Sequence, residues 1–264
     1  MIKVIVLGAA GRMGSTILRL VREDSELKLV GAVERADSPY IGEDSSKFGG
    51  VQGVKITSSL KDIVEKDTVV VDFTHIYSTL DNVRLASNIG FPMVIGTTGF
   101  EPDQLEEIKQ SAKHFPCVMS PNMSLGVNLL FKLVYEAAKV LGDDYDVEIL
   151  EIHHRMKKDA PSGTAVRLGQ IVAEALNRDY NKTAVFTRKG IIGERKKDEI
   201  GMQTLRAGDV VGEHTIIFGG MGERIELIHR AHSRENFARG AIRAIKWVHD
   251  KKPGLYSMKE VLGL

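Results

Sequence analysis

A dense cluster of basic side chains occupies the segment 153–158, where five of six residues are basic or become so on protonation. The Pro-Ser-Gly-Thr sequence at 161–164 is typical of a helix start. Free amides at a helix N-terminus, with the Thr164 hydroxyl, form a seat for anions, and neighbouring cations strengthen it. Histidine and lysine also donate protons near neutral pH. The segment therefore predicts a site that binds and protonates a small substrate with two anionic groups.

Other interpretations of this cluster stay open at this stage. Adjacent histidines on a strand point to opposite faces, so one of His153 and His154 can be structural, and basic runs are often solvated loops. A metal site is the least favoured, because the two histidines lack helical i, i+4 spacing and we expect no nearby acid to complete a zinc triad. Cys117 is interpreted as a buried strand residue, since no partnered base is evident to activate its thiol.

A glycine pattern at the start of the chain is the second chemical signal. Gly8, Gly11 and Gly14 lie between a strand candidate and a helix candidate, as in a dinucleotide-binding fingerprint, although Ala10 stands where the middle glycine is usual. Glycine lets the backbone turn sharply and approach a pyrophosphate, which helix amides then hold. A purely structural turn is the alternative. The residues expected to contact a cofactor here are Gly8, Ala9, Ala10, Gly11, Arg12 and Met13.

Two adjacent charged residues, Glu34 and Arg35, end the second predicted strand. A carboxylate at this place accepts hydrogen bonds from ribose hydroxyls and favours NAD, whereas a guanidinium pairs with the 2′-phosphate of NADP. The combination predicts a site that accepts both cofactors, and a solvated arginine is the alternative for Arg35. A P-loop is excluded because Gly14 is followed by Ser15 with no lysine, so the chain is not a kinase or ATPase of that kind.

The apolar pattern predicts the elements that position these residues. In the first half, runs at 2–7, 27–34, 54–57, 68–73, 92–95 and 117–120 read as strands, and 12–22, 77–88 and 101–114 as helices. Strands that are apolar without alternation are buried on both faces, which is typical of a parallel sheet covered by helices. The fold class predicted is α/β, with a Rossmann-type doubly wound sheet. The Gly-Thr-Thr-Gly sequence at 96–99 then lies at the ligand-binding rim, although an ordinary turn is nearly as good an interpretation.

The second half has a different pattern and predicts a second α+β domain with a mixed or antiparallel sheet. Helix candidates at 124–141 and 163–177 flank a strand at 146–153, and eight glycines between Gly190 and Gly222 accompany short alternating stretches at 214–218 and 224–229. We interpret these glycines mostly as turns between antiparallel strands. Another helix is expected at 234–249, and the change of composition near residue 122 marks the domain boundary.

Composition narrows the function classes. Basic and acidic residues nearly balance, 36 against 35, so no global charge attracts nucleic acid or a membrane surface. The apolar start at 4–10 is far shorter than the roughly 20 residues of a membrane span, and no cleavage pattern follows it. A single cysteine forms no internal disulfide and favours a reducing compartment. We expect a cytoplasmic protein that has neither nucleic-acid nor membrane partners.

Together these motifs resemble the dihydrodipicolinate reductase family of bacterial lysine biosynthesis. The resemblance covers essentially the whole chain and includes the stretches 205–214 and 231–240; its most specific element is His-His-x-x-Lys followed by Ser-Gly-Thr. It implies hydride transfer from NADH or NADPH to the dehydrated imine of 4-hydroxy-tetrahydrodipicolinate, in lysine and diaminopimelate biosynthesis. Ala10 is the main departure from the family's glycine-rich loop, and the cofactor preference stays open.

The resemblance also implies roles for residues and domains. His153 and Lys157 become the proton donors, and the substrate's carboxylates are held by His154, Gly163 and Thr164. The nicotinamide half of the cofactor contacts Gly96, Thr97, Thr98, Ser120, Pro121, Asn122 and Met123. Residues 1–122 form the dinucleotide-binding domain, completed by 238–264, and 123–237 bind substrate and assemble a homotetramer. Closure of the two domains over the ligands is a further expectation.

Two alternatives to this reductase come from other classes. A different two-domain dehydrogenase, of the aspartate-semialdehyde or homoserine type, is the first; the semialdehyde type needs a nucleophilic cysteine, for which Cys117 is a poor candidate. The second is a non-catalytic sensor that binds NADH without consuming it and uses the basic cluster to contact a protein. Oxidation of NADH in the presence of substrate separates these alternatives.

Overall fold

Short apolar runs of the first half form a seven-stranded sheet in the computed structural model, which describes residues 1–264. The strand order is β12-β6-β5-β4-β1-β2-β3, and every neighbouring pair is parallel. The strands are β1 (Ile2–Leu7), β2 (Leu27–Val33), β3 (Ile56–Thr57), β4 (Thr68–Asp72), β5 (Met93–Ile95), β6 (Pro116–Met119) and β12 (Gly254–Tyr256). The chain order reverses between β1 and β4, and doubly wound sheets bind their ligands beside such a switch point.

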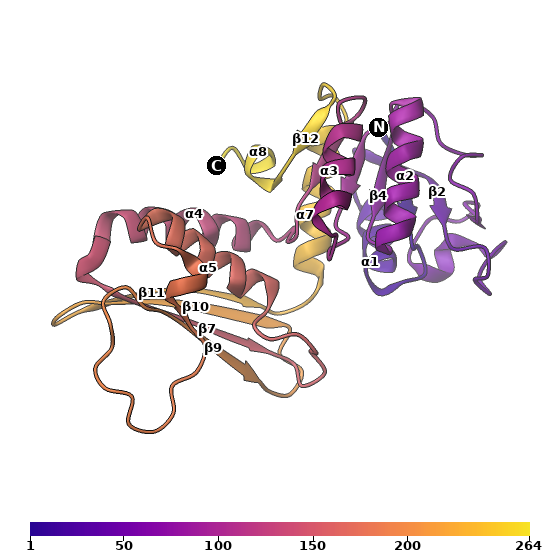
Figure 1. Cartoon of the computed structure of the whole chain (residues 1–264). Helices are drawn as coiled ribbons and strands as arrows, with labels where there is room; N and C mark the ends of the chain where they lie inside the picture. The colour runs from indigo at the N-terminus through magenta and orange to yellow at the C-terminus, as the bar shows by residue number, and fades with distance from the viewer. The chain divides into compact units, whose positions relative to one another are not determined.

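Both faces of this sheet are buried, which is why its strands lack alternation. Val4 and Val6 of β1 belong to the core shared with α1 and α7, whereas Ile5 and Leu7 belong to the core shared with α2 and α3. Figure 1 shows α2 and α3 side by side on one face. The helices are α1 (Arg12–Glu23), α2 (Ile76–Ile89), α3 (Pro102–Ser111), α7 (Glu235–Val248) and the short α8 (Met258–Leu262). The doubly wound parallel sheet predicted from the sequence is confirmed.

The chain divides into two compact units. The first comprises Met1–Leu125 with Glu235–Leu264, and the second comprises Gly126–Arg234. The C-terminal residues complete the first unit, because β12 pairs with β6 and α7 packs on the core of β1. Gly240 makes this packing possible, since a Cβ there would lie 1.7 Å from the Met123 carbonyl oxygen.

The second unit contains a five-stranded mixed sheet with the order β11-β10-β7-β9-β8. Helices α4 and α5 cover the face that carries Val147, Ile149, Ile216 and Phe218. Its strands are β7 (Asp146–His153), β8 (Ala184–Val185), β9 (Ile200–Arg206), β10 (Gly212–Gly219) and β11 (Arg224–Ala231). Its helices are α4 (Leu125–Leu141), α5 (Gly163–Ala175) and α6 (Tyr180–Thr183), and two 3₁₀ turns complete the chain's elements, η1 (Ser45–Phe48) and η2 (Gly142–Asp144).

The interpretation of the glycine-rich region as antiparallel strands is only partly right. Strand β10 is antiparallel to both of its neighbours, β11 and β7, but β9 runs parallel to both β7 and β8. Gly201 lies inside β9 rather than in a turn, because a Cβ there would lie 1.7 Å from the Glu148 carboxylate of the next strand. Gly208 and Gly222 do occupy turns, with φ of 49° and 88°.

The predicted helix at 163–177 is too long by two residues. Asn177 has a left-handed φ of 54°, and the Arg178 backbone N–H donates to the Ala173 carbonyl at 2.8 Å. This arrangement closes the helix end, because a left-handed residue past the last turn satisfies its free carbonyls. The α-helix therefore ends at Ala175.

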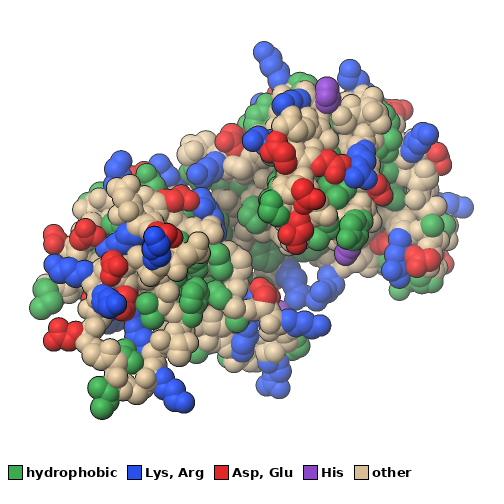
Figure 2. All heavy atoms as spheres, in the orientation of Figure 1, with side chains coloured by type: hydrophobic (Ala, Val, Ile, Leu, Met, Phe, Trp, Pro, Cys, Tyr) green, Lys and Arg blue, Asp and Glu red, His purple; other side chains and the backbone are tan.

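The surface carries charges of both signs. Acidic and basic side chains are interspersed over the face in Figure 2, which agrees with their near balance in the sequence. None of the helices combines the length and the apolar character needed to span a bilayer.

Candidate active site

The glycine segment forms the turn between β1 and α1. Gly8 has a φ of 64°, and its carbonyl accepts the Gly11 N–H at 2.9 Å. A Cβ at Gly14 would lie 2.0 Å from the same carbonyl oxygen, so a side chain there is excluded. No side chain caps α1 and its first turn holds no acid. Its first amides therefore lack side-chain partners, and this turn fits the pyrophosphate of a dinucleotide.

Glu34 is attached directly to this turn. Its Oε1 accepts the Ala10 N–H at 2.8 Å, and the buried Ala9 N–H donates to the Val33 carbonyl at 3.2 Å. Ala10, which stands where the middle glycine is usual, thus donates a backbone hydrogen bond to Glu34, the residue that follows β2. Arg12 is exposed beside the turn, and Met13 packs on the core below it.

Arg35 forms an ion pair with Asp37, two residues further along the chain. Its Nε lies 3.0 Å from the Asp37 carboxylate, and both side chains are largely exposed. An ion pair this exposed is weak, so Arg35 can exchange Asp37 for another anion. Any anion that binds Arg35 would have to replace Asp37 in this ion pair.

The loop after β5 is built on a buried polar network around Asp72. The Asp72 Oδ1 accepts the Thr74 N–H at 2.9 Å and the Thr97 hydroxyl at 3.4 Å, and Asn82 donates to Oδ2 at 2.9 Å. Thr97 also accepts the Thr79 hydroxyl at 2.9 Å. The Thr97 side chain is thus engaged inside the protein, which leaves the exposed Thr98 and the backbone to contact a ligand.

Gly96 is required by packing. A Cβ at Gly96 would lie 2.1 Å from the Phe73 ring, so the ring itself explains the glycine without a ligand. Packing against Phe73 therefore accounts for the glycine at 96, and contact of Gly96 with a cofactor stays a prediction.

The segment after β6 is a hydrogen-bonded turn. The Ser120 hydroxyl donates to the Asn122 carbonyl at 2.9 Å, and the Asn122 side-chain oxygen accepts the Ser124 N–H at 2.9 Å. Pro121 is exposed, whereas Met123 is buried in the core with α7. Of this segment, Pro121 and Asn122 present the most accessible surface.

In the second unit, the buried carboxylate of Glu151 organises the predicted catalytic cluster. It contacts His153 Nδ1 and accepts the Ser162 N–H at 3.0 Å, so it links the end of β7 to the N-terminus of α5. Arg206 donates two hydrogen bonds to it, at 3.0 and 3.1 Å, and the Thr204 hydroxyl lies 3.3 Å away. From the sequence we expected no nearby acid to complete a zinc triad; the structure places one acid, Glu151, beside His153 on the same face of β7.

The electrostatics of this network follow from burial and hydrogen bonding. Burial by itself raises the pKa of Glu151, but hydrogen bonds from His153 and Arg206 outweigh it and lower the pKa to about 2. His214, buried on β10, donates to or accepts from the Ser162 hydroxyl at 3.2 Å. Burial, followed by the nearby His153, lowers the pKa of His214 to about 3, so this ring stays neutral.

The other predicted site residues lie around the same two segments. Lys157 pairs with Asp159 at 2.8 Å, and its backbone N–H donates to the His154 carbonyl at 3.1 Å. The Nδ1 of His154 is buried and has no hydrogen-bond partner. At the start of α5, Ser162 caps the Ala165 N–H at 3.2 Å.

The α5 N-terminus is open to a ligand. No atom lies within 4 Å of the position of a Cβ at Gly163, the first residue of the helix. Thr164 follows it in the first turn. The second unit therefore holds a histidine and a lysine in the segment that precedes α5, and open space beside Gly163 at the start of that helix. No three histidine, cysteine or acidic side chains are arranged to hold a metal ion.

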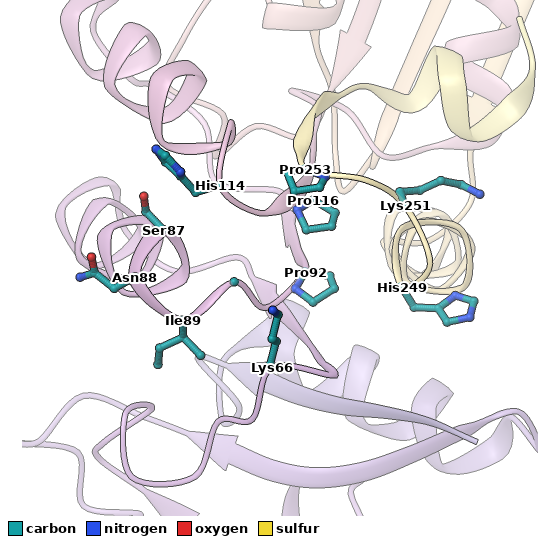
Figure 3. Close-up of a pocket in the computed structure, with 11 residues that line it drawn as sticks. Lys66, Ser87, Asn88, Ile89, Pro92, His114, Pro116, His249, Lys251 and Pro253 are labelled. Carbon is teal, nitrogen blue, oxygen red and sulfur yellow. The ribbon is translucent and has the colours of Figure 1, made fainter.

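A separate hollow lies at the opposite edge of the parallel sheet and contains none of the predicted site residues. Figure 3 shows Lys66, His114, His249 and Lys251 around it, beside the prolines that precede or begin β5 and β6. Helices α2, α3 and α7 end at this edge, where basic side chains complement the negative ends of helix dipoles. Lys251 also packs 5.0 Å over the Trp247 ring. We interpret these cations as helix-end partners.

A doubly wound sheet with an open glycine turn, joined to a second unit with an acid–base cluster, is typical of two-domain NAD(P)-dependent oxidoreductases. Two family models match the chain, "Dihydrodipicolinate reductase, N-terminus" over residues 2–123 and "Dihydrodipicolinate reductase, C-terminus" over residues 126–262. The chain belongs to the dihydrodipicolinate reductase family, and it is an NAD(P)H-dependent oxidoreductase of lysine and diaminopimelate biosynthesis.

Individual relatives agree with the family models. The chain is 53% identical over 265 residues to 4-hydroxy-tetrahydrodipicolinate reductase of Syntrophus aciditrophicus, covering 100% of this chain and 99% of the relative. The same enzyme of Geotalea uraniireducens is 53% identical over 266 residues, with 100% of both chains covered. These matches confirm the family that the motifs indicated.

Solved structures agree on the fold. A dipicolinate-bound dihydrodipicolinate reductase from Paenisporosarcina sp. TG-14 superimposes with a TM-score of 0.77 at 27% identity, covering 97% of each chain. An amine dehydrogenase from Mycobacterium smegmatis has a TM-score of 0.58 at 15% identity, covering 96% of this chain and 94% of its own, which shows a shared fold only.

The aspartate-semialdehyde dehydrogenase alternative also loses support, because burial raises the pKa of the Cys117 thiol and so disfavours a thiolate nucleophile.

Proposed function

We propose that this chain reduces 4-hydroxy-tetrahydrodipicolinate, through its dehydrated imine dihydrodipicolinate, to tetrahydrodipicolinate with NADH or NADPH. One observation carries the proposal: a single buried carboxylate, Glu151, contacts both His153 and the backbone N–H of Ser162. A candidate proton donor and a candidate seat for a substrate carboxylate are thereby held in one hydrogen-bonded unit.

The chemistry assigns a role to the proton donors. Bound NAD(P)H supplies a hydride to a ring carbon of the imine, and the displaced electron pair moves through the conjugated system towards the ring nitrogen. The resulting enamine needs a proton at carbon, which we assign to His153 and Lys157. A positioned cationic acid lowers the barrier because it stabilises the charge that develops in the transition state.

Substrate binding is assigned to the residues beside these donors. His154 has a buried Nδ1 without a partner, which a carboxylate can satisfy if the ring is protonated there. The Gly163 amide and the Thr164 amide and hydroxyl lie in the first turn of α5, where backbone N–H groups favour an anion. These groups suit a planar dicarboxylate.

The cofactor is assigned to the first unit. The turn Gly8–Met13, with Glu34 and Arg35, would hold the adenosine half, since uncapped amides, a ribose acceptor and a cation are gathered there. The segments 96–98 and 120–123 would contact the nicotinamide half. We assign dinucleotide binding to residues 1–122 with 238–264 and substrate binding to 123–237. Hydride transfer needs the donor and acceptor carbons in contact, so we also propose that the two domains close during turnover.

We also propose that the protein is a cytoplasmic homotetramer assembled through the sheet of the second unit. Helices cover one face of that sheet, whereas Leu205 of β9 and Ile228 of β11 lie on the other face with 48% and 42% of their surface exposed. Apolar side chains on an uncovered sheet face favour association with a second copy. Sedimentation of the purified protein tests this: a monomer at micromolar concentration contradicts the assembly.

The decisive experiment is a steady-state assay of NADH and NADPH oxidation with freshly generated substrate. We expect oxidation that depends on the substrate and is competitively inhibited by pyridine-2,6-dicarboxylate. Folded protein that binds the cofactor but does not oxidise it above background would instead support the sensor alternative. Inhibition that does not compete with the substrate would contradict the dicarboxylate assignment.

A further inference from the structure

Glu151 is the one carboxylate that is fully buried in the second unit. Its carboxylate contacts His153 and accepts hydrogen bonds from Ser162, Thr204 and Arg206, which lie on three different elements of the second unit. Burying an ionised carboxylate is costly unless its lone pairs are satisfied, and the two-pronged contact with Arg206 does this. An apolar side chain could fill a purely structural role equally well. The buried charge of Glu151 therefore indicates a role besides packing.

The orientation of His153 supplies the second observation. Its Nδ1 faces Glu151, which directs the opposite nitrogen, Nε2, towards Gly212 of β10. A Cβ at Gly212 would lie 3.0 Å from Nε2, closer than an ordinary contact. A side chain at 212 would therefore crowd Nε2, and this is the ring nitrogen that Glu151 leaves to exchange a proton with a ligand.

Titratable and charged groups lie around His153 on three strands. Glu151 precedes it on β7, and Arg206, its register partner on β9, donates to Glu151. The loop after β7 carries the ion pair of Lys157 with Asp159. From β10, the His214 ring lies edge-on at 5.3 Å. His214 is neutral because of its burial, so the charged group that contacts the His153 ring is the carboxylate of Glu151.

We propose that Glu151, held in place by Arg206, is a positioning residue that keeps a proton of His153 on Nδ1 and so leaves Nε2 as the atom that exchanges a proton with the substrate. This inference rests on the function proposed above. The same carboxylate accepts the Ser162 N–H, so it also fixes the start of α5, where we place the substrate carboxylate, relative to His153.

The first test is Glu151→Gln, which keeps the size and an acceptor oxygen but removes the charge. We expect kcat to fall by about 10–100-fold, the range found when a group that orients a metal-bound histidine is removed. A wild-type kcat in this variant overturns the inference.

Controls separate a local effect from misfolding and from failure of the proposed function. NADH affinity, measured by fluorescence, reports on the first unit and should match the wild type within twofold. Arg206→Lys keeps a cation near Glu151 and should retain more activity than Arg206→Met. If the wild-type enzyme itself shows no substrate-dependent turnover, the proposed function fails; if only Glu151→Gln behaves as wild type, this inference alone fails.

A second pair of variants does not touch the carboxylate. Gly212→Ala places a methyl group against His153 Nε2 and should lower kcat at least fivefold with little change in NADH affinity. Gly219→Ala is the matched control on the same strand, because no atom lies within 4 Å of its added Cβ. Equal kcat in the two variants contradicts the assignment of Nε2 as the donor atom.

Nitrogen-15 spectra of the histidine ring test the orientation without turnover. In the wild-type protein above the titration range, we expect the proton of neutral His153 on Nδ1. A neutral ring protonated on Nε2 would overturn the inference, since Glu151 would then not be an acceptor for it.

Discussion

The carboxylate of Glu34 accepts the backbone N–H of Ala10 at a distance of 2.8 Å. The acid at the end of β2 is therefore part of the glycine turn, and the alanine in that turn keeps the amide that this bond requires. On our assignment, a cofactor bound at this turn would meet a carboxylate whose position is set before binding, which reduces the ordering cost of association.

Glu34→Ala should weaken NADH binding by about 1–3 kcal/mol, because both the acceptor for ribose hydroxyls and the support of the turn are lost. Glu34→Gln keeps an acceptor for the Ala10 N–H while removing the charge that repels a 2′-phosphate. It should therefore improve NADPH binding relative to NADH. Fluorescence titrations with both cofactors measure this, and identical affinity ratios in wild type and Glu34→Gln would refute the charge argument.

Arg35→Ala should weaken NADPH by about 1–3 kcal/mol and NADH much less, since only NADPH offers a charged partner to the guanidinium. Asp37→Asn is the complementary variant: it releases Arg35 from its ion pair and should tighten NADPH binding. Calorimetric titration gives both affinities. Equal losses for the two cofactors in Arg35→Ala would remove Arg35 from recognition of the 2′-phosphate.

Lys157→Ala should reduce kcat strongly and leave NADH affinity nearly intact, because the lysine belongs to the second unit and is assigned to proton donation. Lys158→Ala, at the exposed neighbouring position, should change only KM and by a smaller factor, through loss of a general positive field. Steady-state kinetics with each variant distinguishes these effects. Lys157 has no part in the mechanism if its alanine variant turns over like wild type.

Stability should fall on mild acidification because of His214. Its folded pKa is about 3 against an ordinary 6.5, so between these values the unfolded chain binds a proton that the folded chain does not. The contribution of His214 to the free energy of unfolding is fully present above pH 6.5, and it decreases by about 2 kcal/mol between pH 6.5 and pH 5. Urea unfolding at several pH values measures the slope, and His214→Gln, which cannot titrate, should flatten it. An unchanged slope in that variant would assign the pH dependence to other groups.

Local patterns in the sequence predicted much of the fold. The continuous apolar run of β1 (Ile2–Leu7) indicated a strand buried on both faces, and the structure has it with those bounds. The glycines after it predicted the turn into α1, and the cluster from His153 was expected between a strand and a helix start, where β7 and α5 place it. These features depend on neighbouring residues only, through periodicity, backbone freedom and capping.

The structure revealed partners that no local pattern contains. Arg206 reaches Glu151 because β9 lies parallel to β7, in a register that pairs it with His153. Thr97 is engaged by Asp72 from a neighbouring strand, and Phe73 explains the glycine at 96. Each contact joins residues distant in the sequence, and its geometry depends on strand order and register.

Residue type and local spacing were therefore enough to predict the family, the doubly wound sheet and the segments that carry chemistry. The groups that hold those segments became known from the packed fold: Glu151 contacts His153, Arg206 donates to Glu151, and Ala10 donates to Glu34. A buried charge is stable only where several chain segments supply hydrogen bonds at once, and no local pattern encodes that convergence.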